Sequence, residues 1–210
     1  MKNTIVKLII WFVIYVGYVF MAYEIAIVNI KMNFHEFFEG HLFDVQKYFL
    51  DVSFFFTVYL FILKKPFTST SFVSRCKELY LFHVVFYGIK ICIMYIFVTL
   101  FLFLGASVLG GLYLQIDTRF IFNILNLFAF LFFTYLVYLL FLIKTEKQNL
   151  SLIVGYSINL LILSLYHATS LVSENIFSMI ELLVLNTYSV ASIVMILFIT
   201  VIYRRKEFLS

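Results

Sequence analysis

The sequence predicts an all-α, polytopic membrane protein with six transmembrane helices and both termini in the cytoplasm. Hydrophobic residues make up 64% of the 210 residues and charged residues only 12%, whereas a soluble domain carries about 25% charged residues. The apolar residues gather in runs of about 20, which is the length that a helix needs to cross a bilayer. We therefore expect a single transmembrane domain over residues 1–210, located in the cell membrane as a multi-pass protein.

The first two spans are expected at about residues 5–30 and 45–63. The first has no charge between Lys7 and Glu24. It is too long for a signal peptide, and no small-residue cleavage site follows it. The second span is shorter and carries Asp51 near its start.

The remaining spans are expected at about residues 88–114, 120–143, 150–169 and 182–203. They are apolar on all sides and about twice as long as a barrel strand, so they indicate helices. Lys90 near the start of the third span is expected to extend its ammonium group to the inner interface.

The positions of the charges support this topology. With the N-terminus inside, 12 of the 15 Lys and Arg residues fall on inner segments, and the outer ones are Lys31, Lys47 and Arg119. Eight of the 11 acidic residues lie at or beyond the outer edge. This bias agrees with six spans and two cytoplasmic termini. The net charge of +4 is then a sign of topology, and we expect no nucleic-acid partner, because there is no basic surface patch.

The inner segment after the second span predicts a helix at the cytoplasmic surface. Pro66 ends the second span, because proline cannot continue a helix. An interfacial helix is expected at about residues 68–82, with Phe72 toward lipid and Arg75 and Lys77 toward water. A plain basic loop that only fixes topology is the alternative.

Two outer segments also predict short helices. Residues 31–47 place Phe34, Phe37 and Phe38 at helical spacing, which indicates an amphipathic interfacial helix. The polar residues beside them, His35, Glu36, Glu39 and His41, do not have the spacing of a zincin motif. We expect a solvated polar face there and no metal. A second outer helix is expected at about residues 171–181.

Polar residues inside the spans are few. Asn123 and Asn126 in the fourth span and Asn159 in the fifth are candidates to line a pathway, although such residues more often bridge helices by hydrogen bonds. The chain has no P-loop motif, so we expect no bound nucleotide or other cofactor in this chain. We also expect no catalytic residue, unless Cys76 or Cys92 acts with His83 as in a membrane cysteine peptidase.

This layout resembles the type-2 ABC exporter permeases, in particular the short bacterial permeases that export antimicrobial peptides or confer immunity to them. That family carries a Ser-Arg pair with basic and aromatic residues before the third span, and Ser74-Arg75-Cys76-Lys77-Glu78-Leu79-Tyr80 is similar. Its chains often end in a basic cluster with an acid and apolar residues, as in Arg204-Arg205-Lys206-Glu207-Phe208-Leu209. The short second span departs from the family pattern.

The resemblance implies a division of labour. A separate cytoplasmic ABC ATPase dimer would bind ATP and Mg²⁺ and press on the inner helix, which would act as a coupling helix. The residues implied in this contact are Thr68, Phe72, Ser74, Arg75, Lys77 and Glu78. A second permease copy or a paralogue would complete the pathway among the membrane lipids, and amphipathic peptides would be the cargo.

Three other functions remain open at the level of sequence. The first is a stand-alone membrane immunity protein without an ATPase. The second is the cysteine peptidase described above, and the third is a substrate-capturing subunit of a vitamin importer. Recruitment of a nucleotide-binding partner separates the exporter permease from the stand-alone protein, and replacement of both cysteines by Ser tests the peptidase.

Overall fold

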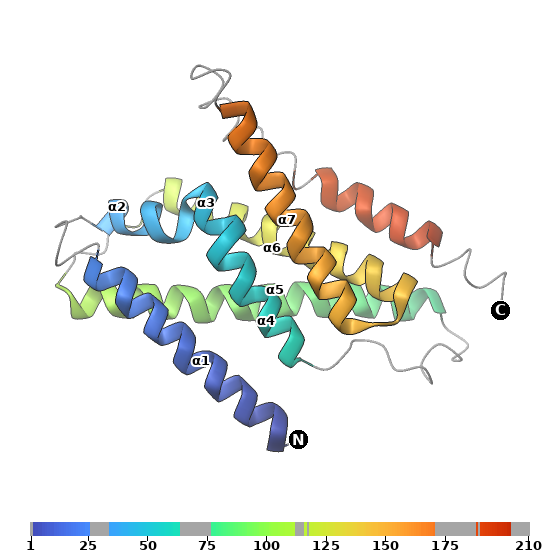
Figure 1. The fold of residues 1–210 in the computed structure, drawn as a ribbon, viewed down its shortest axis with the longest axis horizontal. Coiled ribbons are helices and arrows are strands. Elements are labelled where there is room, and N and C mark those ends of the chain that lie inside the picture. Colours follow the sequence, from blue (N-terminus) through green and yellow to red (C-terminus); the bar gives the residue numbers. More distant parts are fainter. Residues whose placement is uncertain are drawn as a thin grey trace. The chain divides into compact units, whose positions relative to one another are not determined.

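The computed structural model describes residues 2–25, 34–63, 77–111, 116, 118–170, 188 and 190–202 (Figure 1). Every element in these residues is a helix, and none of them lies in a strand. The elements are α1 (Lys2–Tyr23), α2 (Phe34–Phe38), the π-helical turn η2 (Glu39–Phe43), α3 (Val45–Lys47), the π-helical turn η3 (Tyr48–Val52), α4 (Ser53–Ile62), α5 (Lys77–Leu109), α6 (Thr118–Thr145), α7 (Gln148–Ser170) and a last helix at Val190–Ile202.

Three of these helices are long and apolar enough to cross a membrane. Their apolar parts are Asn3–Tyr23 in α1, Phe82–Leu109 in α5 and Phe120–Thr145 in α6. Three shorter apolar helices lie at Phe49–Ile62, Gln148–Ser164 and Val190–Ile202. The all-helical class is therefore confirmed for the described residues, and three helices are compatible with a membrane protein. The full count of six spans and the location of the termini stay predictions.

Helix α1 shows how the apolar surface is divided. Trp11, Tyr15, Val19 and Ala22 recur at three- and four-residue spacing and are buried. Large apolar side chains on the other sides of α1, such as Val13 and Met21, are exposed. Such a wide exposed apolar surface is unfavourable in water and suits lipid.

The chain divides into two compact units. Unit 1 consists of Met1–Leu63 and Ile93–Leu127, and unit 2 consists of Lys64–Cys92 and Phe128–Ser210. Helices α5 and α6 each contribute residues to both units.

Unit 1 packs α1, α4 and part of α5 through aromatic side chains with polar ends. The hydrogen bonds that join these helices run from Trp11 Nε1 to the Phe55 carbonyl (3.1 Å), from the Tyr95 hydroxyl to the Val52 carbonyl (3.1 Å), and between the hydroxyls of Tyr15 and Thr99 (3.0 Å). All three are buried, so each large ring fills the interior while its polar atom has a partner.

The segment predicted as an amphipathic interfacial helix, residues 31–47, is described from Phe34 onward and begins with the helix α2. The three phenylalanines of α2, Phe34, Phe37 and Phe38, are buried against other residues of the protein. The ring centroids of Phe37 and Phe103 are 5.5 Å apart, and those of Phe38 and Phe120 are 5.3 Å apart. The helical spacing of the phenylalanines was predicted, but their partners are residues of α5 and α6.

Unit 2 contains a tight antiparallel pair, α6 and α7. Only Glu146 and Lys147 connect the two helices, and Glu146 takes a left-handed conformation with φ 59°. A Cβ on Gly155 in α7 would lie 3.9 Å from the backbone of Tyr138 in α6, an ordinary van der Waals distance, so the two helices are in contact there. Small residues at such contacts let membrane helices pack closely.

Helix α5 is one unbroken helix of 33 residues from Lys77 to Leu109. No proline interrupts it, and its first glycine is Gly88. The expected surface helix at residues 68–82 lies partly outside the described residues, and residues 77–82 of it continue directly into the third span. Any turn between a surface helix and the third span therefore precedes Lys77.

Candidate functional site

The residues implied in an ATPase contact lie at and before the start of α5. Thr68, Phe72, Ser74 and Arg75 are outside the described residues, whereas Lys77 and Glu78 form the first turn of α5. The second outer helix, expected at residues 171–181, also lies outside the described residues.

The N-terminal half of α5 is joined to α6 by a close aromatic contact. An ideal Cβ built on Gly88 would collide with the ring of Tyr135. The hydroxyl of Tyr135 donates a hydrogen bond to the carbonyl oxygen of Val84 at 2.9 Å. Val84 is one turn before Gly88, so Tyr135 reaches across the glycine and binds the backbone of α5.

Asn159 is a bridge between helices. It is buried, and its Nδ2 donates to the Thr134 hydroxyl at 3.1 Å. The Thr134 hydroxyl in turn donates to the Phe130 carbonyl at 3.0 Å. The result is a polar connection from α7 to α6 within the apolar interior of unit 2, which is the common role of asparagine in membrane helices.

Asn123 and Asn126 belong to a different unit of the chain from Asn159. Both belong to unit 1, whereas Asn159 belongs to unit 2. Among the described residues, Oδ1 of Asn126 is buried without a hydrogen-bond partner. A pathway lining formed by Asn123, Asn126 and Asn159 stays a prediction.

Cys92 and His83 do not form a catalytic pair. They are nine residues apart in α5, which places them on opposite faces of the helix and about 13 Å apart along its axis. Cys92 is fully buried, whereas His83 is exposed. Cys76 lies outside the described residues.

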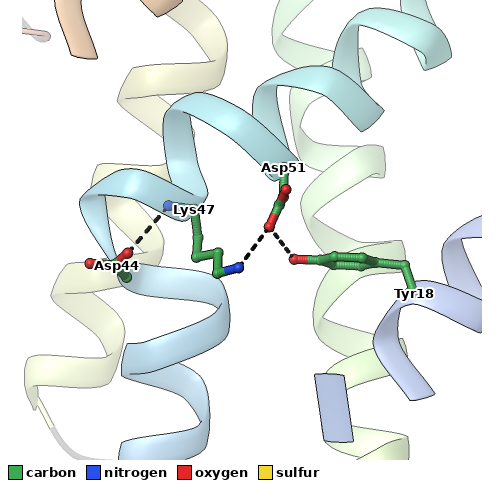
Figure 2. A network of polar contacts seen from close by, with 4 residues as sticks. All are labelled: Tyr18, Asp44, Lys47 and Asp51. Carbon is green, nitrogen blue, oxygen red and sulfur yellow. Dashed lines mark hydrogen bonds and ion pairs between the residues drawn. The ribbon is translucent and has the colours of Figure 1, made fainter. Parts of the chain in front are cut away.

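A polar network in unit 1 connects α1 to the turn η3. Figure 2 shows Oδ2 of Asp51, which accepts a hydrogen bond from the Tyr18 hydroxyl at 2.7 Å and pairs with Nζ of Lys47 at 3.1 Å. The backbone N–H of Lys47 donates to Oδ2 of Asp44 at 3.4 Å, so Asp44 caps the short helix α3. The network thus provides the Asp51 carboxylate with an opposite charge from Lys47 and a hydrogen bond from Tyr18.

The predicted site residues did not include Asp51, although its position near the start of the expected second span was a usable signal. Asp51 is an acidic residue inside the expected second span, and charged groups within spans are rare and often functional. Its partner Tyr18 is 33 residues away in the chain, and no local pattern links the two.

His41 lies next to this network, on the turn η2. Partial burial lowers the pKa of His41 below its usual value of 6.5, and the positive charge of Lys47 lowers this pKa further. The carboxylates of Asp51 and Asp44 oppose the shift. The lowered pKa favours an uncharged imidazole at neutral pH, so His41 does not add to the charge of Lys47.

The described part of the chain contains no group of three His, Cys, Asp or Glu side chains that could hold a metal ion. No family model, no curated protein and no solved structure matches the chain. Its function is therefore inferred from the residues and contacts given above, which define an all-helical chain with three helices fit to cross a membrane.

Proposed function

We propose that the chain is the membrane-spanning permease subunit of an ATP-driven exporter that moves amphipathic peptides across the cell membrane. A separate cytoplasmic ABC ATPase dimer would hydrolyse ATP, and a second copy of the permease or a paralogue would complete the pathway. Export of toxic peptides would give the cell immunity or resistance to them.

The observation that carries the proposal is the unbroken course of α5 from the charged inner segment. Its 33 residues rise about 50 Å, against about 30 Å for the hydrocarbon core of a bilayer. The apolar part begins only at Phe82. The first turns, with Lys77 and Glu78, are thus well placed to extend beyond the lipid toward a cytoplasmic partner.

A displacement of the N-terminal end of α5 by the ATPase would be transmitted to α6. Tyr135 of α6 lies against Gly88 and binds the Val84 carbonyl, and both of these residues are in the N-terminal half of α5. A continuous helix without a hinge, tied to its neighbour within unit 2, is the kind of rigid element that transmits a displacement.

The experiment is co-purification of the gently extracted protein with its ATPase. In the double variant Arg75→Glu with Lys77→Glu, we expect loss of the ATPase with retention of the folded permease. The matched control is Lys144→Glu with Lys147→Glu, which reverses two exposed inner charges near the α6–α7 turn. Because this control changes the net charge equally, it should keep the partner.

Two outcomes contradict the proposal. If the unchanged protein never recruits a nucleotide-binding partner, the stand-alone immunity protein is favoured. If the Arg75/Lys77 double variant binds the ATPase as well as the unchanged protein does, the contact is not at the start of α5.

A further inference from the structure

The Tyr18–Asp51–Lys47 network lies beside the apolar parts of two helices of unit 1. In α1, Tyr18 precedes the end of the apolar part at Tyr23 by five residues, or about 8 Å. In α5, Tyr95 binds the carbonyl of Val52, the neighbour of Asp51, and precedes the end of the apolar part at Leu109 by 14 residues, or about 21 Å. The residues that contact Asp51 and its neighbour Val52 in α1 and α5 thus belong to the apolar parts of these helices.

A carboxylate between the apolar parts of membrane helices requires a partner, because an unpaired charge in hydrocarbon is unfavourable by several kcal/mol. Lys47 supplies the opposite charge, and Tyr18 supplies a short hydrogen bond. The turn η3, a π-helical turn from Tyr48 to Val52, presents Asp51 toward α1. Such turns occur frequently at functional sites.

Among the contacts that the structure describes, only one of the two oxygens of the Asp51 carboxylate takes part. Both contacts are made to Oδ2 (Figure 2). A carboxylate can accept about four hydrogen bonds. The side chains of Asp51 and Lys47 are 29% and 37% exposed, so the pair is not sealed inside the protein.

The ammonium group of Lys47 also shows which ligand chemistry fits Asp51. It binds Oδ2 on a flexible stem, four residues from Asp51 in the same helical stretch. A second ammonium or guanidinium group that displaced it would leave the carboxylate paired throughout the exchange. The cost of an unpaired charge between apolar helices would then be avoided. Aromatic rings beside the site, with Tyr18 and Phe55 at 5.0 Å between centroids, also suit a cation.

We infer that Asp51, oriented by Tyr18, binds the ammonium or guanidinium group of a cationic amphipathic peptide, and that Lys47 is the internal cation that occupies this position in the absence of the peptide. The choice of a peptide as the ligand rests on the proposed export function. The cation-binding role of Asp51 rests on the geometry of unit 1 alone.

The test measures binding to the purified full-length chain without any ATPase, so its outcome is independent of ATPase recruitment. Fluorescently labelled peptides without tryptophan are titrated into the protein in phosphatidylcholine nanodiscs, and anisotropy is recorded. One peptide is a lysine-bearing amphipathic helix, and its twin carries Gln in place of every Lys. Trp11 is the single tryptophan and donates to the Phe55 carbonyl, so its emission reports whether each variant keeps the fold of unit 1.

We expect Asp51→Asn to weaken binding of the lysine peptide at least about tenfold and to leave the neutral twin unchanged. Lys47→Gln should strengthen binding of the lysine peptide by about threefold or more, because the competing internal cation is gone. The control Glu36→Gln removes an exposed acid of the same outer segment and should change neither affinity.

The sign of the Lys47 result is decisive if Asp51→Asn does not keep the Trp11 emission, because binding caused by a loss of folding would raise the affinity for the neutral twin as well. Equal affinities for the unchanged protein and Lys47→Gln, or weaker binding by Lys47→Gln, would overturn the inference. Nanodiscs of phosphatidylethanolamine give the second arm. If they abolish the difference between the unchanged protein and Asp51→Asn, a lipid headgroup is the source of the ammonium group and the peptide assignment fails.

Discussion

The aromatic ring of Tyr135 lies directly against the backbone of Gly88, which has no side chain to separate them. A Cβ on Gly88 would occupy the position of the Tyr135 ring, and the Tyr135 hydroxyl binds the Val84 carbonyl one turn away at 2.9 Å. Tyr135 is fully buried, so its hydroxyl would lack a partner if α5 moved outward. The contact therefore fixes both the distance and the rotation of α5 against α6 within unit 2.

The variant Gly88→Ala should destabilise the protein by about 1–3 kcal/mol, because the new methyl group forces the ring and the helix apart. The measurement is unfolding in mixed micelles as the denaturing detergent is increased. The matched control is Gly105→Ala in the same helix, where a Cβ meets no atom within 4 Å. Similar stability for the two variants would contradict the close contact at Gly88.

The variant Tyr18→Phe should lower the stability of unit 1 by about 0.6 kcal/mol, and at most about 1.7 kcal/mol, the mean and the largest value measured for hydrogen bonds between membrane helices. It removes only the hydroxyl that donates to Asp51 at 2.7 Å. Thermal unfolding followed by Trp11 emission is the measurement. Tyr87→Phe, at an exposed position in α5, is the control. If the two variants unfold at the same temperature, the Tyr18–Asp51 bond does not stabilise the fold.

The positions of the long helices were largely predictable from sequence, and the reason is physical. A backbone in lipid must satisfy its own hydrogen bonds, so the length of an apolar run nearly fixes a helix. The fourth span was expected at residues 120–143, and α6 covers Thr118–Thr145. Which face of a helix meets protein was not predictable, because a phenylalanine that faces lipid and one that faces protein have the same spacing. Phe37 and Phe38 illustrate this, since both are buried against the protein.

The candidate site was less predictable than the fold, because its contacts join distant parts of the chain. Asp51 was noted only as an acidic residue near the start of the second span, and Tyr18 is one of 15 tyrosines and has no distinguishing neighbour in sequence. Asn123 and Asn159 were grouped by their polarity. The structure assigns Asn159 to unit 2 with Thr134 as its partner, and this pairing depends on the short turn that makes α6 and α7 antiparallel.

The Asn159–Thr134 bond should give a coupling energy of about 0.6 kcal/mol, and at most about 1.7 kcal/mol, in a double-mutant cycle. The single variants are Asn159→Ala and Thr134→Val, and the cycle is closed by the double variant. Detergent-induced unfolding provides the free energies. Strictly additive effects of the two substitutions would show that the bond does not contribute to stability.

The lowered pKa of His41 predicts a stability that depends on pH in a defined direction. Partial burial disfavours the charged imidazole, and the nearby ammonium of Lys47 adds to this effect. The unfolded chain, with a His pKa near 6.5, therefore takes up a proton at a higher pH than the folded protein does. Stability from this group is complete above about pH 6.5 and falls as the pH decreases toward and through the folded pKa.

The melting temperature, followed by Trp11 emission, should accordingly decrease between about pH 7 and pH 5. The variant His41→Gln should reduce this dependence, because Gln does not titrate in this range. His83→Gln, which removes an exposed imidazole on α5, is the control and should keep the full dependence. A pH profile that His41→Gln leaves unchanged would show that another group is responsible. The environment of His41 beside Lys47, Asp44 and Asp51 would then not govern the acid response of unit 1.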